Sequence, residues 1–230
     1  MDVLSCRKMK KPLFIFVTLL TSVCLTGCID LAVNDGKNKR VDLKKITHAK
    51  GEVYTMRGGL GGVFSKGMNR LEDNLENDYQ IYASSTVWYK ANALSQHIIA
   101  QYKTEKVHGP IILVGHSLGA NEQIKVARNL ARANIPVALL MTIDAVSPVT
   151  VPPNVEYAFN IYKPSFVPLF SGLTLKAMDQ KRTHIENFNV TAIKDTSVNH
   201  FTIDGNKQVQ KLMLDKVLAI LNVPSKSDML

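Results

Sequence analysis

The residues best suited to chemistry form the pentapeptide GHSLG, residues 115–119, which carries Ser117 between two glycines. A serine hydroxyl is a weak nucleophile unless a base takes its proton, and that base needs a third group to orient it. Histidine is the usual base, and only His184 and His200 follow Ser117 along the chain. Because aspartates are also present downstream, the sequence contains the residue types for acyl transfer through a serine nucleophile.

Ser117 is flanked by elements that suit a nucleophile. The apolar run 111–114 predicts a buried strand and residues 120–130 predict a helix, so Ser117 falls at a sharp turn between them. Side chains at Gly115 and Gly119 would collide with the neighbouring strand and helix, where such a turn brings backbones close together. This strand, turn and helix around Gly-x-Ser-x-Gly resemble the nucleophile elbow of the α/β-hydrolase superfamily, which implies that Ser117 is the nucleophile.

The resemblance also implies an order along the chain, which is serine, then acid, then histidine. His200 follows the last predicted strand and precedes the final predicted helix, where the family has its histidine, so we expect His200 to be the general base. His184 lies in a charged connection, and we expect it at the surface or in loop packing. His116 should point away from its neighbour Ser117 and pack beneath the turn.

Two aspartates are candidates for the acid. Asp144 ends the apolar run 136–144, so its carboxylate should emerge beside the serine at the carboxyl edge of the sheet, where such sheets place their ligands. Asp195 also follows a predicted strand, but it lies only five positions before His200. In the superfamily the acid commonly follows a later strand, although some lipases carry it at the earlier position; residues 155–166 offer no carboxylate after that later strand. We therefore expect Asp144 to be the acid, with Asp195 as the alternative.

A glycine-rich loop, residues 57–68, follows the first predicted strand. Glycines let backbone N–H groups approach a substrate closely, and the loop stands where the family often has a His-Gly pair, with Arg57 in the place of the histidine. The resemblance implies that the amides of Leu118 and Leu60 form the oxyanion hole, with Gly59 as the alternative to Leu60. A flexible turn with no catalytic part is the other interpretation of this loop.

Short β-rich runs alternate with helical patterns, as expected for a mainly parallel sheet covered by helices. The predicted strands are residues 52–57, 79–84, 111–116, 136–144, 155–162 and 188–193. The predicted helices are residues 85–106, with Ser85 or Thr86 as N-cap, 121–135 and 206–221. These patterns predict a three-layer α/β/α sandwich with about six strands. The resemblance implies a minimal α/β-hydrolase fold with no large cap.

The N-terminal segment has the layout of an export signal. Basic residues precede an apolar stretch, residues 12–25, that is too short for a mature membrane anchor. Residues 25–28, Leu-Thr-Gly-Cys, resemble the bacterial lipobox, which implies removal of residues 1–27 and attachment of lipid, with acyl chains such as palmitate, to Cys28. Ile29 is not the aspartate of an inner-membrane retention signal, so the outer membrane of a diderm bacterium is favoured. An ordinary cleaved signal is the alternative.

The remaining chain is expected to form one domain. Residues 28–48 are polar and lack aromatic side chains, which predicts a flexible tether, and residues 49–224 are expected to be the hydrolase domain, before a tail at 225–230. Cys6 and Cys24 leave with the signal, so no thiol remains for a disulfide or a metal site, and the core must stabilise the domain. The formal net charge is +9 at pH 7, and part of this excess lies beside the expected anchor, where it could attract anionic lipid.

Together these features predict a membrane-anchored serine hydrolase of the lipase or esterase kind, which cleaves carboxylic esters through an acyl-enzyme. A thioesterase or acyltransferase could use the same residues, and a catalytically silent lipoprotein that binds an envelope component is the alternative class. The connection 162–178 is rich in apolar residues and could form an acyl-binding wall, a small lid or a buried loop. We expect an ester-containing small molecule or lipid as substrate, the membrane as partner through Cys28, and no cofactor, metal or nucleic acid. The patterns leave the oligomeric state open.

Overall fold

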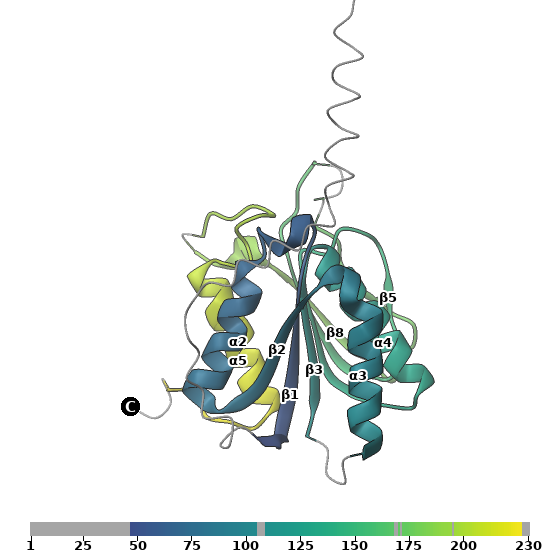
Figure 1. Ribbon diagram of the computed structural model, residues 1–230. Helices are drawn as coiled ribbons and strands as arrows, with labels where there is room; N and C mark the ends of the chain where they lie inside the picture. Colours follow the sequence, from purple (N-terminus) through teal and green to yellow (C-terminus); the bar gives the residue numbers. More distant parts are fainter. Residues whose placement is uncertain (1–46, 105–108, 168–169, 171, 195, 227–230) are drawn as a thin grey trace, which may run out of the picture.

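The computed structural model describes most of the predicted domain (Figure 1). The described residues are 47–104, 109–167, 170, 172–194 and 196–226. The predicted signal peptide, the lipidation site Cys28 and the alternative acid Asp195 lie outside them. The first described strand, β1 (Thr47–Arg57), includes the last two residues of the segment interpreted as a tether.

A parallel sheet forms the centre of the described residues. Its strands are β1, β2 (Ile81–Val87), β3 (Ile111–His116), β4 (Val137–Ile143), β6 (Val155–Tyr162) and β8 (His184–Asn189). They stand in the order β2-β1-β3-β4-β6-β8, and each neighbouring pair is parallel. Every residue of β3 is buried, which explains why this central strand is an apolar run and not an alternating pattern. A separate pair of short strands is β5 (Thr150–Val151) with β7 (Lys176–Ala177).

Helices cover both faces of this sheet (Figure 1). They are α2 (Lys66–Tyr79), α3 (Ala91–Thr104), α4 (Leu118–Arg132) and α5 (Lys207–Ile220), with short 3-10 turns η1 (Leu60–Gly62), η2 (Trp88–Lys90) and η3 (Val190–Ala192). Helices α2 and α5 lie on one face, and α3 and α4 lie on the other, so that both apolar faces of the sheet are buried. The predicted fold class, a three-layer α/β/α sandwich with a mainly parallel sheet, is confirmed.

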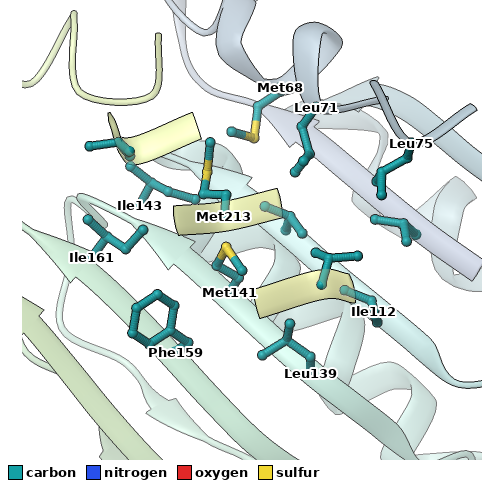
Figure 2. Close-up of a cluster of buried hydrophobic side chains, with 14 of the residues drawn as sticks. Met68, Leu71, Leu75, Ile112, Leu139, Met141, Ile143, Phe159, Ile161 and Met213 are labelled. Atoms are coloured by element: carbon teal, nitrogen blue, oxygen red, sulfur yellow. The ribbon is translucent and has the colours of Figure 1, made fainter. Parts of the chain in front are cut away.

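The layer between the sheet and helices α2 and α5 is closely packed with apolar side chains (Figure 2). The labelled residues are Met68, Leu71 and Leu75 of α2, Met213 of α5, and Ile112, Leu139, Met141, Ile143, Phe159 and Ile161 of the sheet. Burying each large side chain of this kind contributes about 1.5–3 kcal/mol. This layer holds the central strands in place, and the loops at their carboxyl ends carry the candidate site.

The sequence patterns do not predict helix α2. They indicate a glycine-rich loop over residues 57–68 and a strand over residues 79–84, and no helix between them. In the structure the helix begins at Lys66 and buries Met68, Leu71 and Leu75, whose spacing of three and four residues marks its inner side. Most of its other residues are polar, so the apolar pattern is weak in the sequence. Packing against the sheet stabilises a helix that local pattern alone does not indicate.

The last strand differs from its prediction. Strand β8 ends at Asn189, whereas the sequence predicts a strand over 188–193. The side chain of Asn189 accepts a hydrogen bond from the N–H of Thr191 and begins the turn η3, which ends the strand early. The strand also starts earlier than predicted, at His184, a residue that the sequence pattern places in a connection.

Helix α3 starts later than predicted. Ser85 and Thr86, the expected N-cap candidates, belong to strand β2, and the turn η2 intervenes before the helix. Ala91 and Ile98 of this helix are both buried against the sheet.

Candidate active site

Ser117 lies at the turn between β3 and α4, where the pentapeptide predicts it. Its backbone angles are φ 60° and ψ −127°, which a non-glycine residue rarely adopts, and its N–H donates to the carbonyl of Ile143 at 2.9 Å. A Cβ on Gly115 would lie 2.5 Å from the carbonyl oxygen of Gly119, and one on Gly119 would lie 2.3 Å from that of Met56. Both distances are too short for real atoms, so the two glycines are what allows β1, β3 and α4 to meet at this turn.

Asp144, His200 and Ser117 form a continuous hydrogen-bonded chain. His200 Nδ1 lies 2.6 Å from Asp144 Oδ2, and His200 Nε2 lies 2.9 Å from Ser117 Oγ. Because an ionised carboxylate only accepts, Nδ1–H donates to Asp144, and Nε2 is left to accept from the serine hydroxyl. All three residues are buried. The structure thus brings together a serine hydroxyl, an imidazole and a carboxylate from the segments that follow β3, β8 and β4.

Asp144 directly follows β4 at the carboxyl edge of the sheet, beside the strand that carries the serine. Its N–H donates to the carbonyl of Ile161 at 2.8 Å, and its Oδ1 accepts from the N–H of Lys163 at 3.3 Å. These contacts hold the side chain so that Oδ2 faces His200. Asp144 therefore lies where the sequence predicts the acid, whereas Asp195 is outside the described residues.

Strained backbone is concentrated at this site. Leu60, Ser117 and Asp144 have φ values of 53°, 60° and 49°. The other non-glycine residues with positive φ in the described part of the chain are Gln80, Asn134 and Asn222, each next to the end of a helix, where this conformation is common. Such a conformation costs on the order of 1–3 kcal/mol and persists only where the surrounding structure enforces it. Its occurrence around the serine supports a functional role for this turn.

The loop after β1 packs directly against the serine turn. A Cβ on Gly58 would lie 3.2 Å from the serine Oγ, and one on Gly59 would lie 3.1 Å from Leu118 Cδ1. The N–H of Gly58 already donates to Ser65 Oγ at 3.0 Å. Gly59, Leu60 and Leu118 line the same cavity as the serine, and none of their N–H groups has an acceptor among the hydrogen bonds of the described residues. The three amides expected at an oxyanion hole are therefore all at the site.

Ser117 and His200 line a largely apolar cavity with a volume of about 310 Å³. Its other lining residues are Gly59, Leu60, Phe64, Ser65, His116, Leu118, Val146, Phe170 and Phe201. The ring centroid of Phe170 lies 4.2 Å from that of His200, and the ring of Phe201 contacts those of Phe170 and Phe64 at 5.3 and 5.2 Å. An apolar cavity with a few converging polar groups is typical of a small-molecule site.

The connection 162–178 contributes to the cavity wall at Phe170. Other residues of this connection have different environments, because Leu175 is buried in the core while Phe166 is fully exposed and Val167 is about half exposed. One segment therefore combines a residue of the cavity wall, a buried residue and exposed residues, and its expected role in acyl binding stays a prediction.

His116 is buried beneath the turn, as predicted, but it does more than pack. Its Nε2 lies 2.8 Å from the backbone carbonyl oxygen of His200, and its Nδ1 lies 2.8 Å from Ser65 Oγ. Burial, and next the nearby His200, lower the pKa of His116 from 6.5 to about 4, so the ring is neutral at pH 7. Nothing in the sequence indicates the contact with Ser65, since 51 positions separate the two residues.

His184 does not take part in this site. It begins β8 at the amino end of the strand, so it lies at the opposite edge of the sheet from His200, which follows the carboxyl end. The ring of His184 is exposed and stacks on Tyr157, with centroids 5.4 Å apart. Of the two histidines downstream of the serine, the structure brings His200 to it.

The described residues contain neither a metal-binding cluster nor a helix that could span a membrane. Among the residues that the structure describes, no group of three or more His, Cys, Asp or Glu side chains is placed to hold a metal ion. Within that same part of the chain, no helix has both the length and the apolar character needed to cross a bilayer.

No protein-family model matches the chain, and neither does any curated protein. Solved structures do match, and they include thioesterases and esterases. The RedJ thioesterase of the prodiginine pathway in Streptomyces coelicolor is 11% identical, over 78% of this chain and 92% of its own, with a TM-score of 0.45. The type II thioesterase BorB from the borrelidin biosynthetic cluster is 11% identical, over 80% and 100%, with a TM-score of 0.46. An acetyl xylan esterase is 12% identical, over 74% and 97%, with a TM-score of 0.40.

Proposed function

We propose that this chain is a serine hydrolase that cleaves carboxylic esters with apolar acyl groups. The observation that carries the proposal is the hydrogen-bonded chain from Asp144 through His200 to Ser117 at the wall of an apolar cavity. A hydroxyl held 2.9 Å from the unprotonated nitrogen of an oriented histidine is activated as a nucleophile. A silent binding protein has no chemical need for this geometry.

In the first half-reaction, Ser117 Oγ attacks the carbonyl carbon of the ester while its proton passes to His200 Nε2. Asp144 holds the imidazole in the required tautomer and stabilises the imidazolium that forms. His200 then gives its proton to the departing alcohol oxygen as the carbon–oxygen bond breaks. The alcohol leaves, and the acyl group remains attached to the serine.

The carbonyl oxygen becomes negatively charged when the tetrahedral intermediate forms. The N–H of Leu118, at the start of α4, is the first donor for this charge, and the N–H of Leu60 or Gly59 is the second. Removal of one such donor typically lowers kcat by about 10²- to 10³-fold. In the second half-reaction, His200 takes a proton from water, the water oxygen attacks the acyl carbon, and the serine recovers its proton as the carboxylic acid leaves.

The surroundings of the serine support an apolar acyl group. Leu60, Phe64, Leu118 and Phe201 are between 36% and 61% exposed, although all four are large apolar residues that line the cavity. Contiguous exposed apolar surface of this kind usually marks a binding site. We therefore favour a lipase-like or esterase-like activity on lipid or lipid-like esters.

We also propose that the protein is attached to the bacterial outer membrane by lipid on Cys28, which would keep it near such esters. The lipobox-like residues 25–28 support this location. Cells that express the protein and grow with radiolabelled palmitate should label the wild type but not Cys28→Ala, and the variant should leave the membrane fraction. A wild type that takes up no label would contradict the anchor and leave the hydrolase proposal untouched.

The hydrolase proposal is tested with a fluorophosphonate probe and a series of nitrophenyl esters. Wild type should be labelled and active, Ser117→Ala should not be labelled, and His200→Ala and Asp144→Asn should lose about 10²- to 10⁴-fold in kcat. His184→Ala is the matched control, because this exposed histidine lies at the other edge of the sheet, and Asp195→Asn separates the two candidate acids. A folded wild type that neither takes the probe nor turns over any ester would overturn the proposal.

A further inference from the structure

His116 is a buried titratable group that has no proton-transfer task in the proposed mechanism. It is 1% exposed, and each of its ring nitrogens has a hydrogen-bond partner. One partner is Ser65, in the loop after β1, and the other is the backbone carbonyl of His200, in the segment after β8. His116 therefore connects the two loops that carry the oxyanion donors and the general base.

The partners of His116 determine which of its nitrogens carries the proton. A backbone carbonyl only accepts, so Nε2–H donates to the carbonyl of His200 at 2.8 Å. Nδ1 is then unprotonated and accepts from the hydroxyl of Ser65 at 2.8 Å. The Oγ of Ser65 in turn accepts from the N–H of Gly58 at 3.0 Å. These hydrogen bonds form a path from Gly58 through Ser65 and His116 to the carbonyl of His200. Every donor in this path has an acceptor, so the ring of His116 has one definite orientation.

The path ends close to the nucleophile. Gly58 precedes the candidate oxyanion donors, and a Cβ on Gly58 would lie only 3.2 Å from Ser117 Oγ. Ser65 is the N-cap residue of α2, a position where a serine normally accepts a hydrogen bond from the helix. It makes no such capping bond, because its hydroxyl is used between Gly58 and His116. A lost helix cap is a cost in stability that suggests another use for this side chain.

A second contact between the same two segments lies beside the first. Asp204 Oδ2 accepts from the N–H of Gly67 at 2.8 Å. Gln210 Nε2 donates to the backbone carbonyls of Gly67 and Asp204 at 2.8 and 2.5 Å. These hydrogen bonds hold the start of α2 to the segment after His200, and none of them uses an atom of His116. We therefore expect the two segments to stay together when the hydrogen bonds of His116 are removed.

We infer that His116 and Ser65 are positioning residues, which set the distance between the oxyanion donors and the general base His200. This inference rests on the proposed function, because it assigns both residues a task within that reaction. A displacement of about 1 Å in groups of this kind can lower a rate by about 10²-fold. An apolar side chain of similar volume at residue 116 would fill the space but would make neither hydrogen bond, so it would not fix the positions of the two loops.

The surroundings of His116 keep its ring neutral. Burial, and next His200, lower its pKa to about 4, while the hydrogen bond to the carbonyl of His200 and then the carboxylate of Asp144 act in the opposite direction. Asp204 Oδ1 lies 3.9 Å from His116 Nδ1, too far for a hydrogen bond. A protonated ring could not accept from Ser65, so this neutral state is the one that maintains the path.

The test is steady-state kinetics of the purified protein on one ester. Ser65→Ala and His116→Leu should lower kcat about 10- to 100-fold, with KM within about threefold of wild type. His116→Gln keeps one donor and one acceptor and should recover kcat to within about tenfold of wild type. Ser95→Ala is the matched control and should leave kcat unchanged. Like Ser65, Ser95 is 2% exposed, donates one hydrogen bond and accepts another, but it lies in α3.

Nitrogen-15 spectra of the His116 ring provide a readout that needs no turnover. Wild type should show the neutral Nε2–H tautomer, and Ser65→Ala should shift the Nδ1 signal. If wild type is active but Ser65→Ala and His116→Leu keep its kcat, or if Ser95→Ala loses as much as Ser65→Ala, the positioning role is wrong and the proposed function stands. An inactive wild type overturns the proposed function and the positioning role with it, even if the spectra show the neutral Nε2–H tautomer of His116.

Discussion

For single residues, the candidate site depends on strained backbone and buried polar contacts as much as on side-chain type. Ser117 and Asp144 both have positive φ, and His200 bridges them with contacts of 2.9 and 2.6 Å. Beneath this chain lie two more buried ionisable groups, His116 and Asp204. Their protonation has consequences for stability that can be measured separately from activity.

Burial shifts these two groups in opposite directions along the pH scale. It lowers the pKa of His116 from 6.5 to about 4 and raises the pKa of Asp204 from 3.8 to about 6. Between pH 4 and pH 6.5 the unfolded chain binds a proton at His116 that the folded chain does not. The contribution of the neutral His116 ring to stability is therefore complete above pH 6.5 and is lost as pH falls toward 4. At Asp204 the folded chain holds the proton more tightly, so its contribution is lost as pH rises through 6.

His116→Gln removes the first of these two opposing contributions. We expect the unfolding free energy of wild type, relative to that of the variant, to increase by about 3 kcal/mol between pH 4 and pH 6.5, at about 1.36 kcal/mol per unit of pKa shift. Urea unfolding at several pH values measures this difference. Ser95→Ala is the control, since it removes the two hydrogen bonds of a buried serine hydroxyl but no ionisable group. A pH-independent difference for His116→Gln would be incompatible with a buried neutral ring.

Among the helices and strands, the site lies where β1, β3 and α4 approach one another too closely for a side chain at Gly115 or Gly119. The sequence predicts the strand, the turn and the helix around Ser117, because apolar runs and glycines are local signals. Helix α2 is not predicted, since its apolar residues Met68, Leu71 and Leu75 are few and only their packing against the sheet makes the helix stable. The boundary of β8 is not predicted either, because the capping contact of Asn189 ends that strand.

A methyl group at Gly119 tests the close approach of β1 and α4. The Cβ of Gly119→Ala would lie 2.3 Å from the carbonyl oxygen of Met56, so the two elements must separate. We expect a loss of about 1–3 kcal/mol in unfolding free energy and a lower kcat. Gly205→Ala is the matched control, because the nearest atom to its Cβ, the carbonyl oxygen of Thr202, is 3.8 Å away. Equal urea midpoints for the two variants would show that the turn tolerates a side chain.

In the whole molecule, the parallel sheet brings segments that are far apart in the sequence to one edge. Ser117, Asp144 and His200 follow β3, β4 and β8, and all three meet at the carboxyl edge. Exposed apolar residues collect at the same edge, among them Phe166 in the connection after β6. If the substrate is a lipid, this edge should contact the lipid surface while the ester reaches the serine.

Phe166 offers a test of that contact. Phe166→Ser should lower the hydrolysis of long-chain esters in vesicles about fivefold, because part of the transfer free energy of a phenyl ring is lost. Turnover of a soluble short-chain ester should stay the same. Met178→Ser is the control, since Met178 is 61% exposed and apolar but lies beside the β5–β7 pair. Equal losses for both variants, or a matching loss on the soluble ester, would argue against docking through this edge.

Local signals in the amino-acid sequence were sufficient to predict the turn at Ser117, most of the strands, the fold class and the short set of candidate acids and bases. Periodicity, glycine spacing and residue type all act over a few positions, so they can be read without knowing how the chain folds. The sequence also favoured Asp144 and His200, because each follows a predicted strand and their order matches the resemblance. The contact between Ser65 and His116 was not predicted. These residues are 51 positions apart, and their hydrogen bond depends on how helices and strands pack, which no local pattern records.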